Sequence, residues 1–336
     1  MSERRRIPTP GTPVDSPSHT ASFSGGLPRR RWLKALLGSA AATAFAGRSR
    51  TQAADGRSGR AVRRGRIKQS IVFWCFNSAG EKWSIEKTAR VAVQLGCVSV
   101  ELVDPKDWGV LKKHGLICAI APNGMPGAPF KKGFNNPRYH EEVITRTKAA
   151  IDACADAGFP SVIAFTGFKY RDADDPNSGE ISREEGADNC VKGLKKIAGY
   201  AEKKGVNICL EHLNTRDDSH PMKGHPGYQG DDLDYVADII RRVGSPRVRL
   251  LFDIYHVQIM NGDLIRRLEQ TKDILGHVHT AGNPGRGELD ENQEIQYPPV
   301  MRKLLEIGYQ GYVGQEFIPT RNPLEGLRQA VSLCDV

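Results

Sequence analysis

Eight short runs rich in β-branched and aromatic residues alternate with longer amphipathic segments between Gln69 and the end of the chain. This alternation is typical of βα units, whose strands form a parallel sheet. A barrel of eight such units takes about 250 residues, close to the length available here. We therefore expect residues 69–336 to form a single α/β domain, a (β/α)8 TIM barrel. An open doubly wound sheet is the alternative, but no G-x-G-x-x-G motif follows the first run to support it.

The boundaries of the expected elements follow from the same pattern. The expected strands are 69–76, 97–103, 116–122, 161–166, 206–211, 247–253, 275–280 and 311–317. The expected helices are 84–94, 106–114, 138–157, 182–204, 231–243, 262–273, 297–307 and 323–334. Two connections, 167–181 and 212–230, are longer than most loops in a compact domain. We interpret them either as lids over a site or as contacts between subunits of a homo-oligomer.

Residues 1–68 differ in composition from the rest of the chain. They hold 15 Lys and Arg against 3 Asp and Glu, whereas the remaining residues hold 33 against 36. The net charge of +9 therefore comes from this leader, and the body of the protein is mildly acidic. An acidic body argues against a nucleic-acid partner.

Within the leader, the sequence RRRWLK at residues 29–34 precedes the short apolar run ALLGSAAATAFAG. Twin arginines ahead of such a run resemble a twin-arginine export signal, which we place at residues 29–54. The run is too short to cross a bilayer, which takes about 20 helical residues. We therefore expect a disordered leader, export by the twin-arginine machinery and a periplasmic location. A basic nucleic-acid-binding arm is the alternative, but it does not explain the apolar run.

The seven cysteines are scattered and form no C-x-x-C pair. Most of them fall in apolar runs, where a thiol acts as a small apolar side chain. This odd, scattered set argues against a disulfide framework and against a cysteine-based zinc site.

Four consecutive expected strands carry, at or near their carboxyl ends, a side chain that binds metals or moves protons. Glu211, Asp253 and His279 lie at the ends of the fifth, sixth and seventh strands, and Glu316 lies in the eighth. His256 follows Asp253 by three residues. In a parallel barrel the carboxyl ends of the strands meet at one face, where the active sites of this fold lie. We therefore expect these side chains to converge.

A divalent metal ion is the expected occupant of that face. Three carboxylates packed together repel one another and take up protons unless a cation lies among them. Oxygen and imidazole ligands suit Mn, Mg, Co or Zn, and the residue types do not choose among the four. The alternative is a rim of solvated charges, which does not explain an Asp and a His in otherwise apolar runs.

Four segments, ICLEHLNTRD, LLFDIYHVQIMNGDL, HVHTAGNPGRGELD and IGYQGYVGQEF, resemble hydroxypyruvate isomerases, within the xylose isomerase-like superfamily of sugar isomerases and epimerases. The resemblance covers roughly residues 69–334. It implies three sets of site residues: metal ligands Glu211, Asp253, His279 and Glu316; a catalytic acid/base pair, Glu211 and Glu316; and substrate-binding residues His256 and Arg286.

Two features depart from the pattern of that family. Bacterial hydroxypyruvate isomerases often have Gln at the position of His279, whereas ketose 3-epimerases have His there. The His strengthens the expectation of a metal and keeps a ketose 3-epimerase open as an alternative. The export signal is the second departure, because the familiar isomerase acts on a cytoplasmic metabolite.

The expected chemistry is proton transfer next to a carbonyl group. Such a carbon acid is hard to ionise, so the reaction needs a Lewis acid and a carboxylate that takes the proton. The resemblance implies an intramolecular oxidoreductase of the aldose–ketose type, which interconverts hydroxypyruvate and tartronate semialdehyde, and Arg286 suits a bidentate contact with the substrate carboxylate. The expected partner is thus a small hydroxy-keto acid or a ketose. A non-catalytic, exported carbohydrate-binding barrel is the alternative from another class, but binding alone needs no second carboxylate.

Overall fold

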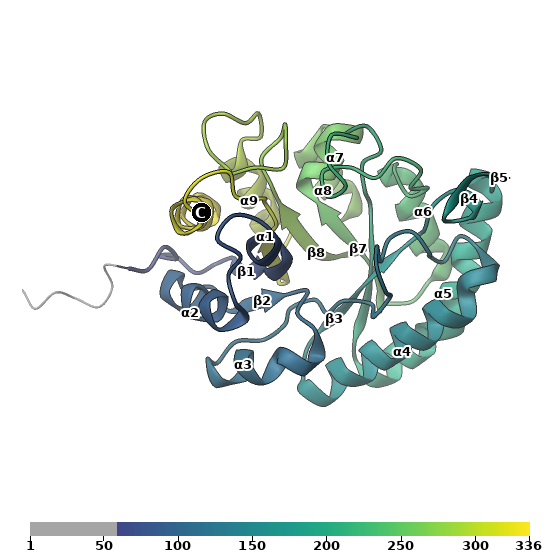
Figure 1. Cartoon of the computed structure of the whole chain (residues 1–336), viewed down its shortest axis with the longest axis horizontal. Helices are drawn as coiled ribbons and strands as arrows, with labels where there is room; N and C mark the ends of the chain where they lie inside the picture. Colours follow the sequence, from purple (N-terminus) through teal and green to yellow (C-terminus); the bar gives the residue numbers. More distant parts are fainter. Residues whose placement is uncertain (1–58) are drawn as a thin grey trace, which may run out of the picture. The chain divides into compact units, whose positions relative to one another are not determined.

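The computed structural model describes residues 59–336, in which seven parallel strands form one curled sheet (Figure 1). The order of the strands in the sheet is β2-β1-β9-β8-β7-β6-β3. Their bounds are β1 Lys68–Val72, β2 Ser99–Glu101, β3 Ser161–Phe165, β6 Asn207–Glu211, β7 Val248–Asp253, β8 Leu275–Thr280 and β9 Tyr312–Gln315. The expected α/β fold with a parallel sheet is therefore confirmed as a TIM-barrel-like fold.

Helices surround the sheet and connect its strands (Figure 1). Several begin as the sequence indicates, since the Ser84 and Ser182 side chains cap α2 and α5, and Gly96 and Gly205 end these helices in the left-handed conformation. The α-helices are α1 Phe73–Ser78, α2 Ile85–Leu95, α3 Trp108–Lys113, α4 His140–Ala157, α5 Arg183–Lys204, α6 Leu233–Val243, α7 Ile254–Met260, α8 Leu264–Thr271, α9 Tyr297–Glu306 and α10 Pro323–Cys334, and two short 3-10 helices are η1 Pro105–Asp107 and η2 Pro137–Tyr139.

The segment 117–121 lies between β2 and β3, the two ends of the sheet order. Ile117 forms a parallel bridge with Ser99, and Ala121 forms one with Val162. Between these bridges, the N–H of Ala119 donates to the side-chain oxygen of Ser99 at 2.9 Å, instead of to a backbone carbonyl. The expected third strand, 116–122, thus occupies the eighth place of the barrel but is not a regular strand, because this contact interrupts its backbone pairing.

Two further expectations are corrected. The first expected strand, 69–76, ends at Val72, and the residues that follow it form α1. A continuous apolar run such as FWCF does not distinguish a strand from a buried helical turn. The long connection 167–181 contains a hairpin of two short strands, β4 Tyr170–Asp172 and β5 Asp175–Glu180.

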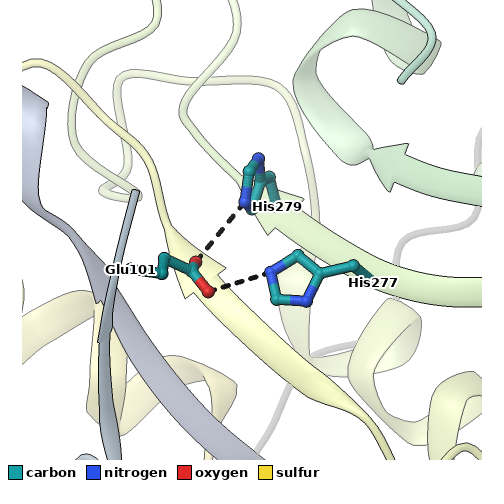
Figure 2. Close-up of side chains that lie close together, drawn as sticks. All are labelled: Glu101, His277 and His279. Atoms are coloured by element: carbon teal, nitrogen blue, oxygen red, sulfur yellow. Dashed lines mark ion pairs between the residues drawn. The ribbon is translucent and has the colours of Figure 1, made fainter. Parts of the chain in front are cut away.

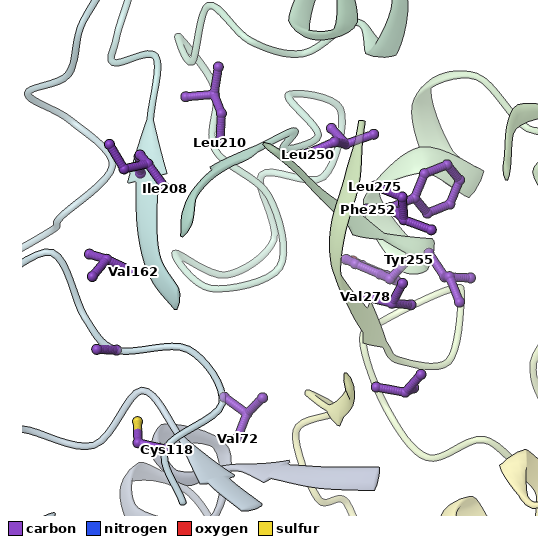
Figure 3. Close-up of a cluster of buried hydrophobic side chains, with 14 of the residues drawn as sticks. Val72, Cys118, Val162, Ile208, Leu210, Leu250, Phe252, Tyr255, Leu275 and Val278 are labelled. Carbon is purple, nitrogen blue, oxygen red and sulfur yellow. The ribbon is translucent and has the colours of Figure 1, made fainter. Parts of the chain in front are cut away.

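Alternate residues of the strands face opposite sides of the sheet. One set packs against the helices in the main core and includes Val162, Leu210, Leu250, Phe252 and Val278 (Figure 3). The other set forms a smaller apolar cluster inside the barrel, with Ile163, Cys209 and Leu251. Because Glu211, Asp253 and His279 fall in this second set, the strand period directs them to the interior.

The chain just before β1 packs against the barrel, although the sequence analysis assigned it to the leader. Ala61, Val62 and Ile67 are buried in the main core. The carboxylate of Asp335 accepts hydrogen bonds from the backbone N–H groups of residues 63, 64 and 65, at 2.5, 2.6 and 2.8 Å. These hydrogen bonds join the segment just before β1 to the C-terminal end of the chain.

The expected export signal, residues 29–54, lies outside the described residues. Within residues 59–336, none of the helices combines the length and the apolar character needed to cross a membrane. All seven cysteines lie in the described part of the chain, where they are buried and unpaired. The expectation that they form no disulfide framework is confirmed.

Candidate metal centre

Four of the predicted site residues meet at the carboxyl end of the barrel. Glu211, Asp253, His279 and Glu316 each direct one ligand atom into a group in which all four atoms lie within 4.8 Å of one another. All four side chains are buried. The register of the sheet brings them together, because Asp253 pairs with His279 across β7 and β8, and His279 pairs with Gly314 across β8 and β9.

The two oxygens of Asp253 face different partners. Its Oδ1 accepts a hydrogen bond from the backbone N–H of Tyr255 at 2.8 Å, at the start of α7. Its Oδ2 lies 3.3 Å from Nη2 of Arg286 and 3.5 Å from Nε2 of His256. One oxygen therefore fixes the orientation of the carboxylate, and the other is directed towards the centre.

The two nitrogens of His279 also face different groups. Its Nδ1 lies 2.8 Å from Oε2 of Glu316 and 3.7 Å from Oε1 of Glu211. Its Nε2 lies on the other side of the ring, 3.4 Å from Oε1 of Glu101 (Figure 2). Sequence reasoning missed Glu101, although a signal was present, since it is the one charged residue in the apolar run CVSVELV.

Arg286 lies closer to the candidate ligands than the sequence suggested. Its buried Nη2 donates to Oε2 of Glu316 at 2.6 Å and to Oδ2 of Asp253 at 3.3 Å, while Nη1 donates to the backbone carbonyl of Met222 at 2.6 Å. Its Nε is buried and has no hydrogen-bond partner among the described residues. The guanidinium thus compensates two carboxylates and uses three of its five N–H donors among the described residues.

The tautomer of His256 follows from its contacts. Its Nδ1 lies 3.1 Å from the backbone N–H of Asn214 and 2.7 Å from Nδ2 of the same residue, and both of these groups donate hydrogen bonds. Because Nδ1 accepts, the ring proton of the neutral imidazole lies on Nε2. Burial, with the nearby charge of Arg286, lowers the pKa of His256 well below its usual value. His256 is therefore a neutral donor that directs Nε2–H towards Asp253.

The charges of the centre are strongly coupled. Burial raises the pKa of Glu211 and of Asp253, and the charge of Glu316 raises both further. Burial also disfavours the charged form of Glu316, but Arg286 and His279 outweigh it and lower the pKa of Glu316. Burial acts against the protonated form of His279, yet Glu316 and the other carboxylates raise its pKa well above the usual value. Without a further cation, the raised pKa values favour protonation of Glu211, Asp253 and His279.

This donor set fits a divalent metal ion. Three carboxylates and one imidazole converge, and Nδ1 of His279 has no hydrogen-bond partner among the described residues. Hard oxygen ligands with one nitrogen suit Mg, Mn, Co or Zn. The residues that would hold the ion are Glu211, Asp253, His279 and Glu316.

A cavity of about 440 Å³ lies beside the centre. Glu211, Glu316 and Arg286 lie at its polar end, and Trp74 donates from Nε1 to Oε1 of Glu316 at 3.0 Å. Most of the remaining wall is apolar, with Leu102, Phe130, Ile163, Phe165 and Leu213. Trp74 therefore forms part of the wall, whereas the neighbouring Phe76 packs in the core against Trp83 and Phe317.

The connection 212–230 supplies another part of this wall. Pro221, Met222 and His225 line the cavity. Sequence reasoning did not single out His225, whose buried ring lies 4.1 Å from that of Phe130, measured between centroids. The connection is tied to the centre through Asn214 and Met222, so it takes part in building the site whether or not it also moves.

Metal binding to this centre should strengthen as the pH rises. Glu211, Asp253 and His279 have raised pKa values, and each must lose its proton before it binds a cation. Affinity is therefore lost as the pH falls through these raised values. Calorimetric titration with Mn²⁺ between about pH 5.5 and 8, in buffers of different ionisation heat, should show proton release. An affinity independent of pH, with no proton release, would contradict this assignment of charges.

A family model described as "Xylose isomerase-like TIM barrel" matches residues 89–335. The putative hydroxypyruvate isomerase of Homo sapiens is 35% identical over 137 residues, 41% of this chain and 47% of that protein, so the match spans about half of the human relative. The hydroxypyruvate isomerase of Escherichia coli is 30% identical over 245 residues, 70% of this chain and 89% of that protein. The 2-oxo-tetronate isomerase of Haemophilus influenzae is 31% identical over 246 residues, 71% of this chain and 89% of that protein.

Two solved structures share the fold. An AP endonuclease of family 2 from Brucella melitensis has a TM-score of 0.65 and 24% identity, and the match covers 78% of this chain and 97% of that one. A 3-keto-D-glucoside 4-epimerase from Escherichia coli has a TM-score of 0.63 and 20% identity, and the match covers 80% of this chain and 99% of that one. At these identities the likeness shows the fold alone, because one barrel supports many chemistries.

Proposed function

Because the chain belongs to the xylose isomerase-like TIM barrel family, we propose that it is a metal-dependent isomerase that interconverts hydroxypyruvate and tartronate semialdehyde. The observation that carries the proposal is the placement of two glutamates around one candidate metal centre. Glu211 ends β6, and Glu316 directly follows β9. These two strands flank β7 and β8 in the sheet, and both glutamates line the cavity. A carboxylate on each side of a bound substrate suits the removal and the return of a proton.

A divalent metal, when bound, polarises a carbonyl group and stabilises the negative charge that develops on it. One of the two glutamates takes a proton from C3 of hydroxypyruvate, and the other returns a proton at C2 of the enediolate. The proton of the C3 hydroxyl group moves to the oxygen on C2. The product, tartronate semialdehyde, then holds the same atoms as the substrate.

His256 and Arg286 have matching roles in substrate binding. Nε2–H of His256 is fixed as a donor by Asn214, so it can donate to a substrate oxygen without changing its tautomer. Three of the five N–H groups of Arg286 bind Glu316, Asp253 and the carbonyl of Met222, and Arg286 lines the cavity, so its remaining N–H groups can donate to the substrate carboxylate. Trp74 and the apolar wall exclude water from the reacting carbons.

Two related activities use the same centre. The relative from Haemophilus influenzae is named for a 2-oxo-tetronate, a longer keto acid, and supports that substrate class as well as the first relatives support hydroxypyruvate. His279, which matches the pattern of ketose 3-epimerases, supports epimerisation of a ketose.

Replacing Glu316 with Gln should leave the fold intact and lower turnover by at least about 10²–10⁴-fold, because the amide cannot move the proton. Circular dichroism and the metal content of the variant separate loss of chemistry from loss of the ion, since Glu316 is also a candidate ligand. Glu325→Gln, at an exposed glutamate of α10, is the matched control and should keep full activity. Wild-type turnover in Glu316→Gln would remove this residue from the mechanism.

Proton exchange in D₂O separates the candidate substrates. The full chain, loaded with Mg²⁺, is incubated with hydroxypyruvate, with a 2-oxo-tetronate and with a panel of ketoses, and deuterium uptake is followed by NMR. Metal-dependent uptake at C3 of hydroxypyruvate, with formation of tartronate semialdehyde, is the expected result. Uptake only with the longer keto acid or with a ketose would transfer the assignment to that substrate. Metal binding without exchange in any of them would favour the non-catalytic binding protein.

We also propose that the twin-arginine segment at residues 29–54 directs export to the periplasm. The basic leader and its short apolar run support this proposal. Replacing Arg29, Arg30 and Arg31 with Lys keeps the charge and should retain the protein in the cytoplasm. Immunoblots of periplasmic and cytoplasmic fractions measure this, and an unchanged distribution would contradict it.

A further inference from the structure

A second buried cluster lies directly behind the candidate metal centre. It consists of Glu101 at the end of β2 and His277 and His279 on β8, whose side chains are 0%, 1% and 0% exposed. Figure 2 shows the Glu101 carboxylate facing both imidazole rings, with one oxygen towards each. Oε2 of Glu101 lies 3.0 Å from Nε2 of His277, and Oε1 lies 3.4 Å from Nε2 of His279. The cluster therefore shares His279 with the metal centre.

Glu101 is the one partner available to the outer nitrogen of His279. Nε2 forms no hydrogen bond of good geometry among the described residues, and the ion pair with Glu101 is its close polar contact. The other nitrogen, Nδ1, faces Glu211 and Glu316. An imidazole that binds a metal through one nitrogen almost always donates its other N–H to a carboxylate, a carbonyl group or water.

The strand opposite His279 leaves room for this carboxylate. Gly314 pairs with His279 across β8 and β9, and a Cβ atom at position 314 would overlap Oε1 of Glu101 and press on Cδ2 of His279. A glycine is thus required here by close approach of the Glu101 side chain, because its φ is not in the left-handed region. The sheet holds a space shaped for Glu101 to face His279.

The charge of Glu101 is compensated within the cluster. Each of its two oxygens faces an imidazole nitrogen, since Oε2 faces Nε2 of His277 and Oε1 faces Nε2 of His279. An ionised carboxylate accepts hydrogen bonds only, so it favours a proton on each nitrogen that faces it. With a cation bound on the Nδ1 side of His279, Glu101 would be the carboxylate left to accept from this ring, and the ring proton would lie on Nε2.

We propose that Glu101 is a positioning residue of the metal centre, which holds the ring proton of His279 on Nε2 and so directs a proton-free Nδ1 towards Glu211, Asp253 and Glu316. His277 holds the second oxygen of the Glu101 carboxylate. The inference rests on the metal centre of the proposed function but not on the identity of its substrate. Partners of this kind typically change metal affinity by about 10–100-fold when they are removed.

A second metal ion in the Glu101 cluster is the competing interpretation, because these three side chains also offer ligand atoms close together. Two observations favour the positioning role. Glu211 and Glu316 of the metal centre line the cavity, whereas none of Glu101, His277 and His279 is among the described residues that do, so the cavity opens onto the metal centre and not onto the Glu101 cluster. Both oxygens of Glu101 already face imidazole nitrogens, those of His277 and His279.

The first test is the replacement of Glu101 with Gln, which keeps the size of the side chain and one acceptor but removes the charge. We expect the dissociation constant for Mn²⁺, measured by calorimetry, to rise by about 10–100-fold. Glu101→Met, which has similar length and no strong acceptor, should weaken binding further. The visible spectrum of the Co²⁺ form should also change in both variants, since it reports the orientation of the imidazole ligand. A purely structural role would lower the melting temperature without this graded change in affinity and spectrum.

The second test moves Glu101 without changing it. Gly314→Ala should displace the carboxylate and weaken Mn²⁺ binding in the same way, and its effect should not add to that of Glu101→Gln, because both act through one contact. Gly276→Ala is the matched control on β8, since a Cβ there would press on Arg249 and Cys209 instead. The control should lose stability but keep wild-type affinity. Gly314→Ala also keeps the inference testable if Glu101→Gln does not fold.

Three outcomes would overturn the inference. Folded Glu101→Gln and Gly314→Ala proteins with wild-type affinity would show that Glu101 does not position His279. Two ions for each wild-type chain, reduced to one in Glu101→Gln, would establish the second metal instead. A wild-type protein that binds no divalent metal would remove both this inference and the metal centre of the proposed function. Weakened metal binding in the variants, with a wild-type enzyme inactive on every candidate substrate, would leave the inference intact and reject the proposed function alone.

Discussion

The burial of three carboxylates at one end of the barrel is the constraint on which the rest of the site depends. Glu211, Asp253 and Glu316 lie within reach of one another and away from water, where like charges repel strongly and each charge loses its hydration. Such a group persists only with cationic partners. Arg286 and His279 supply part of the compensation, and a divalent ion fits the remaining demand.

Further side chains around the centre hold its residues in place. Asn214 fixes the tautomer of His256, and the backbone carbonyl of Met222 holds Arg286, so the connection 212–230 orients two side chains that contact Asp253. On the opposite side, Glu101 faces the outer nitrogen of His279 in space left by Gly314. Each contact restricts one side chain to the orientation in which it meets the centre, which is the preorganisation that catalysis of proton transfer requires.

The centre and the cavity carry different information about function. The four candidate ligands, three carboxylates and one imidazole, are consistent with a metal site in the family to which the chain belongs. The cavity wall is where substrates are distinguished. Its apolar side chains, together with His225 as a buried polar group, set the length and polarity of the molecule that fits beside the two glutamates. Family membership therefore does not identify the substrate, and the cavity wall is the part of the structure that bears on it.

The sequence by itself determined the alternation of strands and helices and the positions of Glu211, Asp253, His279 and Glu316 near strand ends, because these are local properties of period and composition. The predictions of a regular third strand and of a strand over residues 69–76 were wrong, because short apolar runs do not reveal bends or buried helical turns. Only the tertiary structure decided that Glu101 faces His279, that Gly314 makes room for it and that Arg286 contacts two candidate ligands. These pairs are far apart in the chain, and they meet only because strand register and barrel closure bring them together.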